Sequence, residues 1–420
     1  MKYLVILFCA ICAIGQAQTM NVHLKDGQTV RYGLSDIDYV DFSESESVAD
    51  RTVLVYINGE NSLNAYIDEE LEEMMTGSRQ IGDNNLLVYV DRAKSGELPW
   101  LGRIYQGELT DVVNLAEMGI SNQDEYSTDP KVMEAVMRYA FENYPSKNND
   151  YGLVLWGHAS GWLLADSVAY TNAARQRAYG VDSGSNIKRD KGKWINIPTM
   201  AKILKKLPRL RFIFADCCNF QCLETAYELK DVAEFIIGSP AEIPGVGAPY
   251  DTVVPAMFEQ NTFYSSILDR YAEQRAEGLE VPLSVICTAG MEKLAAATSQ
   301  VLQTIVPAFN GAVPDMDGVI HYYYTYQYFD ANDFVRKYAP IADYEQWKQA
   351  FNDVVVYRCM ASEWMTNVRW DPYYSDFTVT EDRYGGVSMY VPQVSDYWTY
   401  ANNIKKMGWY RAAGYPEVGW

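Results

Sequence analysis

The sequence predicts an α/β fold in which helices cover both faces of a mostly parallel central sheet, an α-β-α sandwich. Two observations predict this class. Short, continuously apolar runs such as Thr52–Ile57 are typical of strands buried on both faces of a parallel sheet. Segments with helical periodicity alternate with these runs along the chain. The length of 420 residues allows one large domain with additions, or two domains.

Residues 1–17 are typical of a secretory signal peptide. Lys2 provides a positive start, residues 3–14 form an apolar centre, and Gly15-Gln16-Ala17 forms a cleavage site with small residues at its ends. No other run is long and apolar enough for a transmembrane helix. We therefore expect an exported protein that is periplasmic, at the cell surface or secreted, without a membrane span.

The remaining chain divides into three predicted parts. Residues 18–50 are expected to form a small β-hairpin, which turns at Asp26-Gly27, and an acidic, serine-rich linker. The main domain is expected at residues 51–310. Residues 311–420, which are rich in Tyr and Trp, are expected to form a C-terminal α/β extension of two helices and a strand at 386–391, packed on the main domain.

Charge and cysteine content exclude several classes of function. The net charge of −20 repels nucleic acid and anionic membranes, so neither is expected as a partner. A contribution to solubility alone would also explain the negative charge. Loss of the signal peptide leaves an odd number of cysteines, which does not suit a disulfide framework. They are Cys217, Cys218, Cys222, Cys287 and Cys359. With only three histidines, His23, His158 and His321, we expect no Cys/His metal site, and we interpret His23 as a surface residue and His321 as structural.

The first half of the main domain alternates between strands and helices. Strands are predicted at residues 52–57, 86–90, 103–105 and 151–156, and helices after Ser62 and over 129–144. Ser62 is predicted to cap the first helix. The strand at 151–156 leads into His158, which small residues surround.

A long polar segment at residues 172–193 follows and is predicted to be a loop. It gathers the basic residues Arg175, Arg177, Lys188, Arg189, Lys191 and Lys193 in an otherwise acidic chain. A solvated loop is one interpretation. A cleavage site for an enzyme that cuts after basic residues is the other.

The second half resumes the alternation. Strands are predicted at 212–215, 235–239 and 282–288. Helices are predicted at 223–233 and 291–306, and a further helical stretch after the loop at 240–250 is predicted to end at about residue 276. The strand at 212–215 ends in Asp216-Cys217-Cys218. The loop at 240–250 is rich in Pro and Gly, which predicts an irregular surface path.

A thiol and an imidazole at neighbouring strand ends predict a cysteine nucleophile with a histidine base. His158 provides the imidazole. Because successive side chains of a strand point to opposite faces, only one of Cys217 and Cys218 can share a cleft with His158, and the pattern does not choose between them. Asp216 would raise the pKa of a neighbouring thiol, so it is better explained as a carboxylate that binds an Arg or Lys side chain, or as a hydrogen-bonded turn residue.

Four stretches, in this order, resemble the clostripain-like cysteine peptidases, which are relatives of caspases, legumain and gingipain. They are residues 52–63, residues 152–158, Asp216-Cys217-Cys218 with Glu224-Thr225-Ala226-Tyr227, and residues 239–250. The resemblance implies a caspase-like sheet, a nucleophile at Cys218, a catalytic histidine at His158 and a basic-residue pocket at Asp216. It also implies protein or peptide substrates that are cut after Arg or Lys, and self-cleavage within residues 175–193.

The chain departs from the family pattern beside its candidate catalytic residues. Ala159-Ser160 stands where the family has Gly-Gly or Gly-Ser, so the expected oxyanion donor is the backbone N–H of Ala159. Cys217 stands at an Ala position and introduces a second thiol. No cofactor is expected, but some relatives require calcium; no calcium loop is recognisable, so a calcium requirement stays open.

Two other classes of function compete with the peptidase. An exported binding module that has kept the fold and lost catalysis would account for Ala159 and the additional thiol. A thiol oxidoreductase that uses Cys217, Cys218 and Cys222 lacks the usual Cys-x-x-Cys spacing. The sequence leaves the natural substrate and the oligomeric state open.

Overall fold

The computed structural model describes residues 19–23, 28–37, 48–94, 96–164, 178–184, 192–273, 280–323, 328–365, 377–393 and 398–420. The predicted signal peptide, the turn at 26–27 and residues 38–47 of the predicted linker lie outside these ranges. The chain divides into two compact units, residues up to Ser47 and residues from Val48 onward. The first unit contains the predicted hairpin, in which β1 (Thr19–His23) pairs antiparallel with β2 (Thr29–Gly33).

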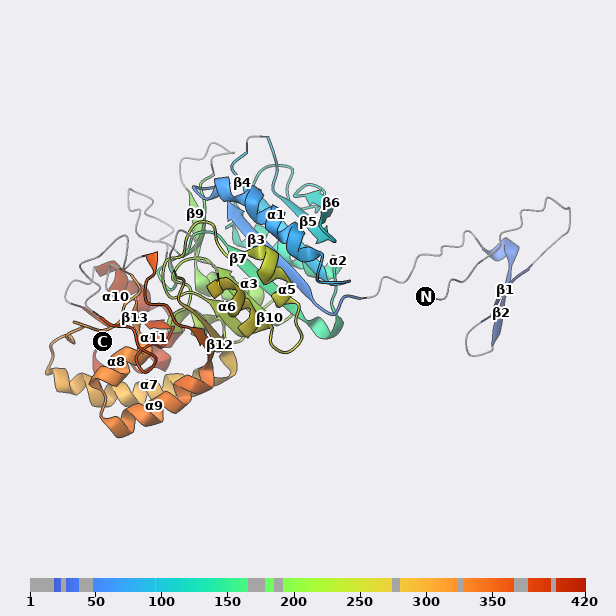
Figure 1. Ribbon diagram of the computed structural model, residues 1–420. Helices are drawn as coiled ribbons and strands as arrows, with labels where there is room; N and C mark the ends of the chain where they lie inside the picture. Colours follow the sequence, from blue (N-terminus) through green and yellow to red (C-terminus); the bar gives the residue numbers. More distant parts are fainter. Residues whose placement is uncertain are drawn as a thin grey trace. The chain divides into compact units, whose positions relative to one another are not determined.

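The second unit is built on a nine-stranded sheet of order β14-β12-β11-β10-β7-β3-β4-β5-β6 (Figure 1). Its five central strands run parallel to one another. They are β3 (Thr52–Gly59), β4 (Asn85–Arg92), β7 (Tyr151–Trp156), β10 (Leu210–Asp216) and β11 (Ala233–Gly238). This confirms the predicted mostly parallel sheet.

Antiparallel strands complete both edges of the sheet. They are β5 (Trp100–Tyr105) and β6 (Glu108–Asn114) on one side, and β12 (Leu283–Cys287) and β14 (Val355–Cys359) on the other. The sequence did not predict β6, because an edge strand with mostly exposed side chains lacks an apolar run. β14 comes from the segment beyond residue 310, which therefore contributes a strand to the main sheet.

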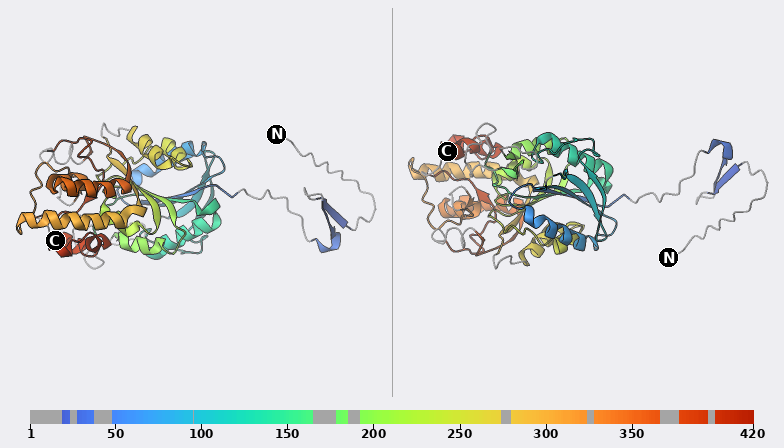
Figure 2. Two further views of the ribbon diagram at one scale, coloured as in Figure 1. Left: turned by 90° about the horizontal axis from the view of Figure 1, so that it is seen from below. Right: turned by 90° about the horizontal axis from the view of Figure 1, so that it is seen from above.

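Helices cover both faces of the sheet (Figure 2). Helices α1 (Ile67–Ser78), α5 (Tyr250–Met257) and α6 (Phe263–Glu273) pack on one face, which we call the α1 face. The helices whose side chains join the core of the opposite face are α2 (Pro130–Asn143), α3 (Ile197–Leu204), α4 (Leu223–Leu229), α7 (Met291–Ile305), α8 (Ala331–Tyr338), α9 (Ile341–Val354) and α11 (Gly408–Ala412). Helix α10 spans Trp398–Ile404.

Alternation along β3 explains why its sequence is continuously apolar. Leu54 and Tyr56 point into the core on one face, and Val53, Val55 and Ile57 point into the core on the α1 face, all with 0% exposure. Each such aliphatic side chain stabilises the fold by about 1.5–3 kcal/mol relative to an exposed position. Among the described helices, none is long and apolar enough to cross a membrane.

Four predictions of elements differ from the structure. Two helices were expected beyond residue 310, whereas the described residues there form α8, α9, α10 and α11. The expected loop at 172–193 contains β8 (Tyr179–Asp182), which pairs with β9 (Lys193–Ile195). The helix expected at 223–233 ends at Leu229, because Ala233 already begins β11. The strand expected at 386–391 is reduced to β15 (Ser388–Met389), which pairs with the short β13 (Phe329–Asp330) and forms a single bridge to Cys222.

Candidate active site

The pairing register of β7 and β10 brings the two predicted strand ends together. Trp156 and Asp216 are register partners in these adjacent parallel strands. His158 and Cys218 each follow two residues later in the sequence. Because neighbouring strands lie about 4.8 Å apart, the backbones of both residues leave the sheet side by side at its carboxyl edge.

Backbone pairing with β8 holds the segment that carries His158. The N–H of Gly180 donates to the carbonyl of His158 at 2.7 Å, and the N–H of Ser160 donates to Ala178 at 2.9 Å. Ala159 opposes Tyr179 between these two bonds. In this type of antiparallel pair, the intervening residue directs its own N–H away from the partner strand. The N–H of Ala159 therefore points away from β8.

Ser62 contacts the imidazole of His158, which the sequence did not predict. The two side chains lie 2.9 Å apart between Ser62 Oγ and His158 Nε2. The predicted capping role of Ser62 is wrong, because α1 begins only at Ile67, after a 3-10 turn. Asn61 holds the preceding backbone in place, since its side-chain amide donates to Val181 O at 2.8 Å and its oxygen accepts from Leu63 N at 2.9 Å.

The two neighbouring thiols lie in different environments. Cys217 is 1% exposed within the core opposite the α1 face, and its burial raises the pKa of the thiol well above its ordinary value. Cys218 is half-buried and packs beside the core of the α1 face, with its sulfur 4.0 Å from Ile243 O. Both are free thiols, so no vicinal disulfide joins them. Cys222 is also buried, and its thiol donates to Thr225.

Asp216 is a buried carboxylate that three donors stabilise. Oδ2 accepts from Ala248 N at 3.0 Å and from the hydroxyl of Tyr250 at 2.9 Å, while Oδ1 accepts from the hydroxyl of Tyr271 at 3.0 Å. Burial raises the pKa of Asp216, and these hydrogen bonds offset part of the rise. Asp216 is thus a hydrogen-bonded residue at the end of β10 that the loop at 240–250 and α6 enclose.

A second buried acid, Glu70, lies beside Asp216. A Cβ atom added at Gly247 would lie 2.7 Å from Asp216 Oδ2 and 3.2 Å from Glu70 Oε1, so both carboxylates pack closely against this glycine and leave no room for a side chain there. Glu70 Oε2 has no hydrogen-bond partner among the described residues. Burial, with the nearby charges of Asp216 and Glu73, raises the pKa of Glu70 to about 10.

Helical periodicity was the signal that could have identified Glu70. It lies on the same side of α1 as Ile67 and Met74, at intervals of three and four residues, and all three are buried. An acid on the apolar side of a helix is unusual unless something pairs with it. This position was not singled out from the sequence.

Of the other predicted basic and histidine residues, Lys193, His23 and His321 lie in the described part of the chain. Arg175, Arg177, Lys188, Arg189 and Lys191 lie outside the described residues. Lys193 lies over the ring of Tyr126, at 4.3 Å from its centroid. His23 is exposed and contacts Thr29, and His321 packs against Phe329 and Phe377, as predicted for surface and structural residues.

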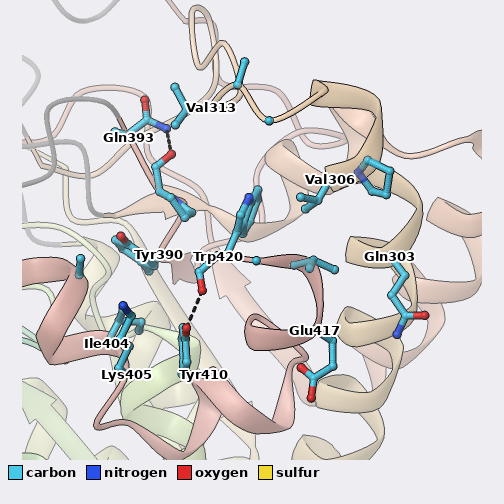
Figure 3. A pocket seen from close by; sticks show the side chains of 17 residues that line it. Gln303, Val306, Val313, Tyr390, Gln393, Ile404, Lys405, Tyr410, Glu417 and Trp420 are labelled. Atoms are coloured by element: carbon cyan, nitrogen blue, oxygen red, sulfur yellow. Dashed lines mark hydrogen bonds between the residues drawn. The ribbon is translucent and has the colours of Figure 1, made fainter.

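A cavity of about 760 Å³ lies in the C-terminal part of the chain (Figure 3). Tyr390, Tyr410 and the terminal Trp420 line it, and the hydroxyl of Tyr410 donates to Trp420 O. None of His158, Cys218 and Asp216 lines this cavity.

A thiol and an imidazole are the two groups that cysteine-dependent hydrolases use as nucleophile and base. The model of the clostripain family matches residues 55–413, and the chain therefore belongs to this family of cysteine peptidases.

Individual relatives agree with this assignment. The chain is 23% identical to clostripain of Hathewaya histolytica over 222 residues, which is 48% of this chain and 41% of that protein. A secreted C11 cysteine protease from Bacteroides thetaiotaomicron, solved with an irreversible peptide inhibitor, matches with a TM-score of 0.70 and 29% identity, over 88% of this chain and 100% of the other. An inactive zymogen of a C11 protease from Parabacteroides distasonis matches with a TM-score of 0.68 and 25% identity, over 87% and 99%.

The raised pKa of Glu70 predicts a specific loss of stability at high pH. The folded chain retains this proton up to about pH 10, whereas the ordinary pKa of a glutamate, as in the unfolded chain, is 4.5. Stability from this group is therefore complete below pH 4.5 and falls as the pH rises toward 10. Relative to Glu70→Gln, the wild-type free energy of unfolding should fall by about 2.7 kcal/mol between pH 6 and pH 8 in urea titrations. Parallel pH profiles for the two proteins would contradict this.

Proposed function

We propose that this protein is an exported cysteine endopeptidase that cleaves peptide bonds after Arg or Lys, with Cys218 as the nucleophile and His158 as its base. The observation that supports this most directly is the register of β7 and β10. Trp156 pairs with Asp216, and His158 and Cys218 each follow two residues after a member of this pair. The partial exposure of Cys218, in contrast to the buried Cys217, supports the choice between the thiols.

The contacts of His158 suggest how the pair would act. Ser62 engages Nε2, so Nδ1 is the nitrogen assigned to the thiol proton. The sulfur of Cys218 attacks the substrate carbonyl carbon as its proton passes to His158. His158 then gives this proton to the leaving amine, and a thioester forms. Water, activated by His158, hydrolyses the thioester and releases Cys218. The outward N–H of Ala159 is the proposed donor to the oxyanion.

The acids on the α1 face support a preference for basic side chains. Asp216 and Glu70 both pack against Gly247, so a substrate cation that displaces this part of the loop at 240–250 would meet two carboxylates in a site of low dielectric. The tyrosines that bind Asp216 hold it in place without adding a positive charge. Arrival of a guanidinium or ammonium group would displace the proton of Glu70.

Export and maturation form the remaining parts of the proposal. The signal-like residues 1–17 support export, and the similar protease from Bacteroides thetaiotaomicron is described as secreted. Self-cleavage within residues 175–193 is supported by the basic residues there and by the zymogen form of the Parabacteroides relative.

The choice of nucleophile predicts that substitutions of the two neighbouring cysteines have unequal effects on activity. Cys218→Ala and His158→Ala should each reduce hydrolysis of a fluorogenic Arg peptide by at least about 1,000-fold. Cys217→Ala should retain most of the activity, because this side chain is enclosed in the core. Circular dichroism confirms that each variant is folded. Equal loss in both cysteine variants would contradict the assignment, and a folded wild-type protein without activity would favour the binding module.

The role of Asp216 predicts discrimination by charge. The wild-type enzyme should cleave an Arg peptide much faster than its citrulline analogue, which has nearly the same shape and no charge. Asp216→Asn should lower kcat/KM for the Arg peptide about 100-fold and leave the citrulline rate nearly unchanged. Glu70→Gln, assayed alongside, should act in the same direction. Retention of full Arg preference in both variants would eliminate the acid site.

Self-processing predicts new chain ends after particular residues. Incubated wild-type protein should yield fragments whose N-termini follow Arg175, Arg177, Lys188, Arg189, Lys191 or Lys193, as read by N-terminal sequencing. Cys218→Ala protein should remain intact under the same conditions. New ends outside residues 175–193, or full activity of an uncut chain, would remove this part of the proposal.

A further inference from the structure

The cavity of about 760 Å³ in the C-terminal part of the chain has no role in the proposed peptidase chemistry (Figure 3). We call it the C-terminal cavity. Its walls come from the end of α7 and the turn that follows, from the segment directly after β15, and from α10, α11 and residues 417–420. Its volume lies within the range of roughly 300–1,000 Å³ that is typical of small-molecule sites.

The floor of the C-terminal cavity is apolar and largely aromatic. Ile404, Tyr390 and Tyr410 line it and are 1%, 3% and 8% exposed. Val306 and the ring of Trp420 complete this surface, and the hydroxyl of Tyr410 donates to Trp420 O. Aromatic and aliphatic walls of this kind favour a ligand that carries apolar side chains.

Two unpaired charges of opposite sign line the same cavity. Lys405 and Glu417 are both exposed, and neither side chain forms a hydrogen bond or an ion pair in the part of the chain that the structure describes. Burial, with the charge of Glu417, raises the pKa of Tyr410, so this carboxylate lies near the cavity floor. A ligand with one positive and one negative end would pair with both charges, whereas a neutral ligand would pair with neither.

We propose that the C-terminal cavity binds a short zwitterionic peptide with apolar side chains. Its ammonium group would face Glu417, its carboxylate would face Lys405, and its side chains would pack on the aromatic floor. Free peptides of this kind are the end products of protein digestion. Binding itself does not depend on the proposed peptidase activity of this chain.

Tyr390 connects the C-terminal cavity to both candidate catalytic segments. Its N–H donates to Glu224 Oε1 at 2.8 Å, in the helix α4 that follows Cys218. Its ring packs edge-on against Trp162, four residues after His158, with 5.2 Å between the ring centroids. A peptide that packs against Tyr390 would therefore restrain the backbone segments of both residues through directly contacting groups.

The first test measures binding to the full mature chain with Cys218→Ala, which lacks the proposed nucleophile. Isothermal titration with the dipeptide leucyl-phenylalanine, which contains no basic residue, should show one peptide per chain with a Kd below about 1 mM. The same dipeptide with an acetylated N-terminus and an amidated C-terminus keeps its side chains and loses both charges. It should bind about 10-fold more weakly, because two ion pairs are lost. No binding of the free dipeptide, or equal binding of the two forms, would overturn the proposal.

Substitutions locate the peptide. Lys405→Met and Glu417→Gln, each added to the same background, should weaken binding of the free dipeptide about fivefold and leave binding of the blocked form unchanged. Lys406→Met changes an exposed neighbour that does not line the cavity, so it should leave both affinities unchanged. Circular dichroism confirms that the variants are folded. Unaltered binding of the free dipeptide in both cavity variants would contradict this placement.

The connection through Tyr390 is tested on the wild-type thiol. Saturating leucyl-phenylalanine should slow the alkylation of Cys218 by iodoacetamide about fivefold, as measured by mass spectrometry, because both catalytic segments are restrained. Lys405→Met at the same dipeptide concentration should show less protection. Alkylation requires only an accessible thiol, so this result is informative even for a protein that cleaves no peptide. An unchanged or faster rate in the presence of bound dipeptide would remove the connection.

Discussion

The pairing of β7 with β10 is the constraint on which the rest of this molecule depends. It sets Trp156 opposite Asp216 and, two residues later, places His158 and Cys218 at one edge. A shift of one residue would move every following side chain of β10 to the other face. Cys217 would then take the half-exposed position, and Asp216 would leave the tyrosines that enclose it. The burial of apolar side chains on both faces specifies this register.

Buried acidic side chains are an unusual feature of the structure, and they occur in two separate places. On the α1 face, Asp216 is stabilised by a backbone N–H and two tyrosine hydroxyls. One carboxylate oxygen of Glu70, Oε2, has no hydrogen-bond partner among the described residues. At the ends of β3 and β4, Asp91 has no donor at all among the described residues. Each arrangement lowers the stability of the folded chain. We propose that the first arrangement serves the recognition of a substrate cation.

The sequence predicted the parts of the fold that are governed by burial. The central strands were recognisable because residues such as Val53 and Leu54 face two cores. Edge strand β6 and the β8–β9 pair lack that pattern, so they were missed. The sequence suggested His158, Cys218 and Asp216 as site residues because each lies at or just beyond the end of a predicted strand, and their roles stay predictions. Ser62 and Glu70 were not identified as site residues, because their roles arise from contacts across 96 residues in one case and from the enclosing loop at 240–250 in the other.

The most direct test of this account locates the reactive sulfur chemically. The wild-type protein is treated with an Arg-based peptide inhibitor that alkylates active-site thiols, digested with an unrelated protease, and analysed by tandem mass spectrometry. Cys217 and Cys218 are resolved by fragment ions between them. We predict a single adduct on Cys218 that His158→Ala prevents. An adduct on Cys217 or Cys222, or labelling of Cys218 that does not depend on His158, would contradict the account.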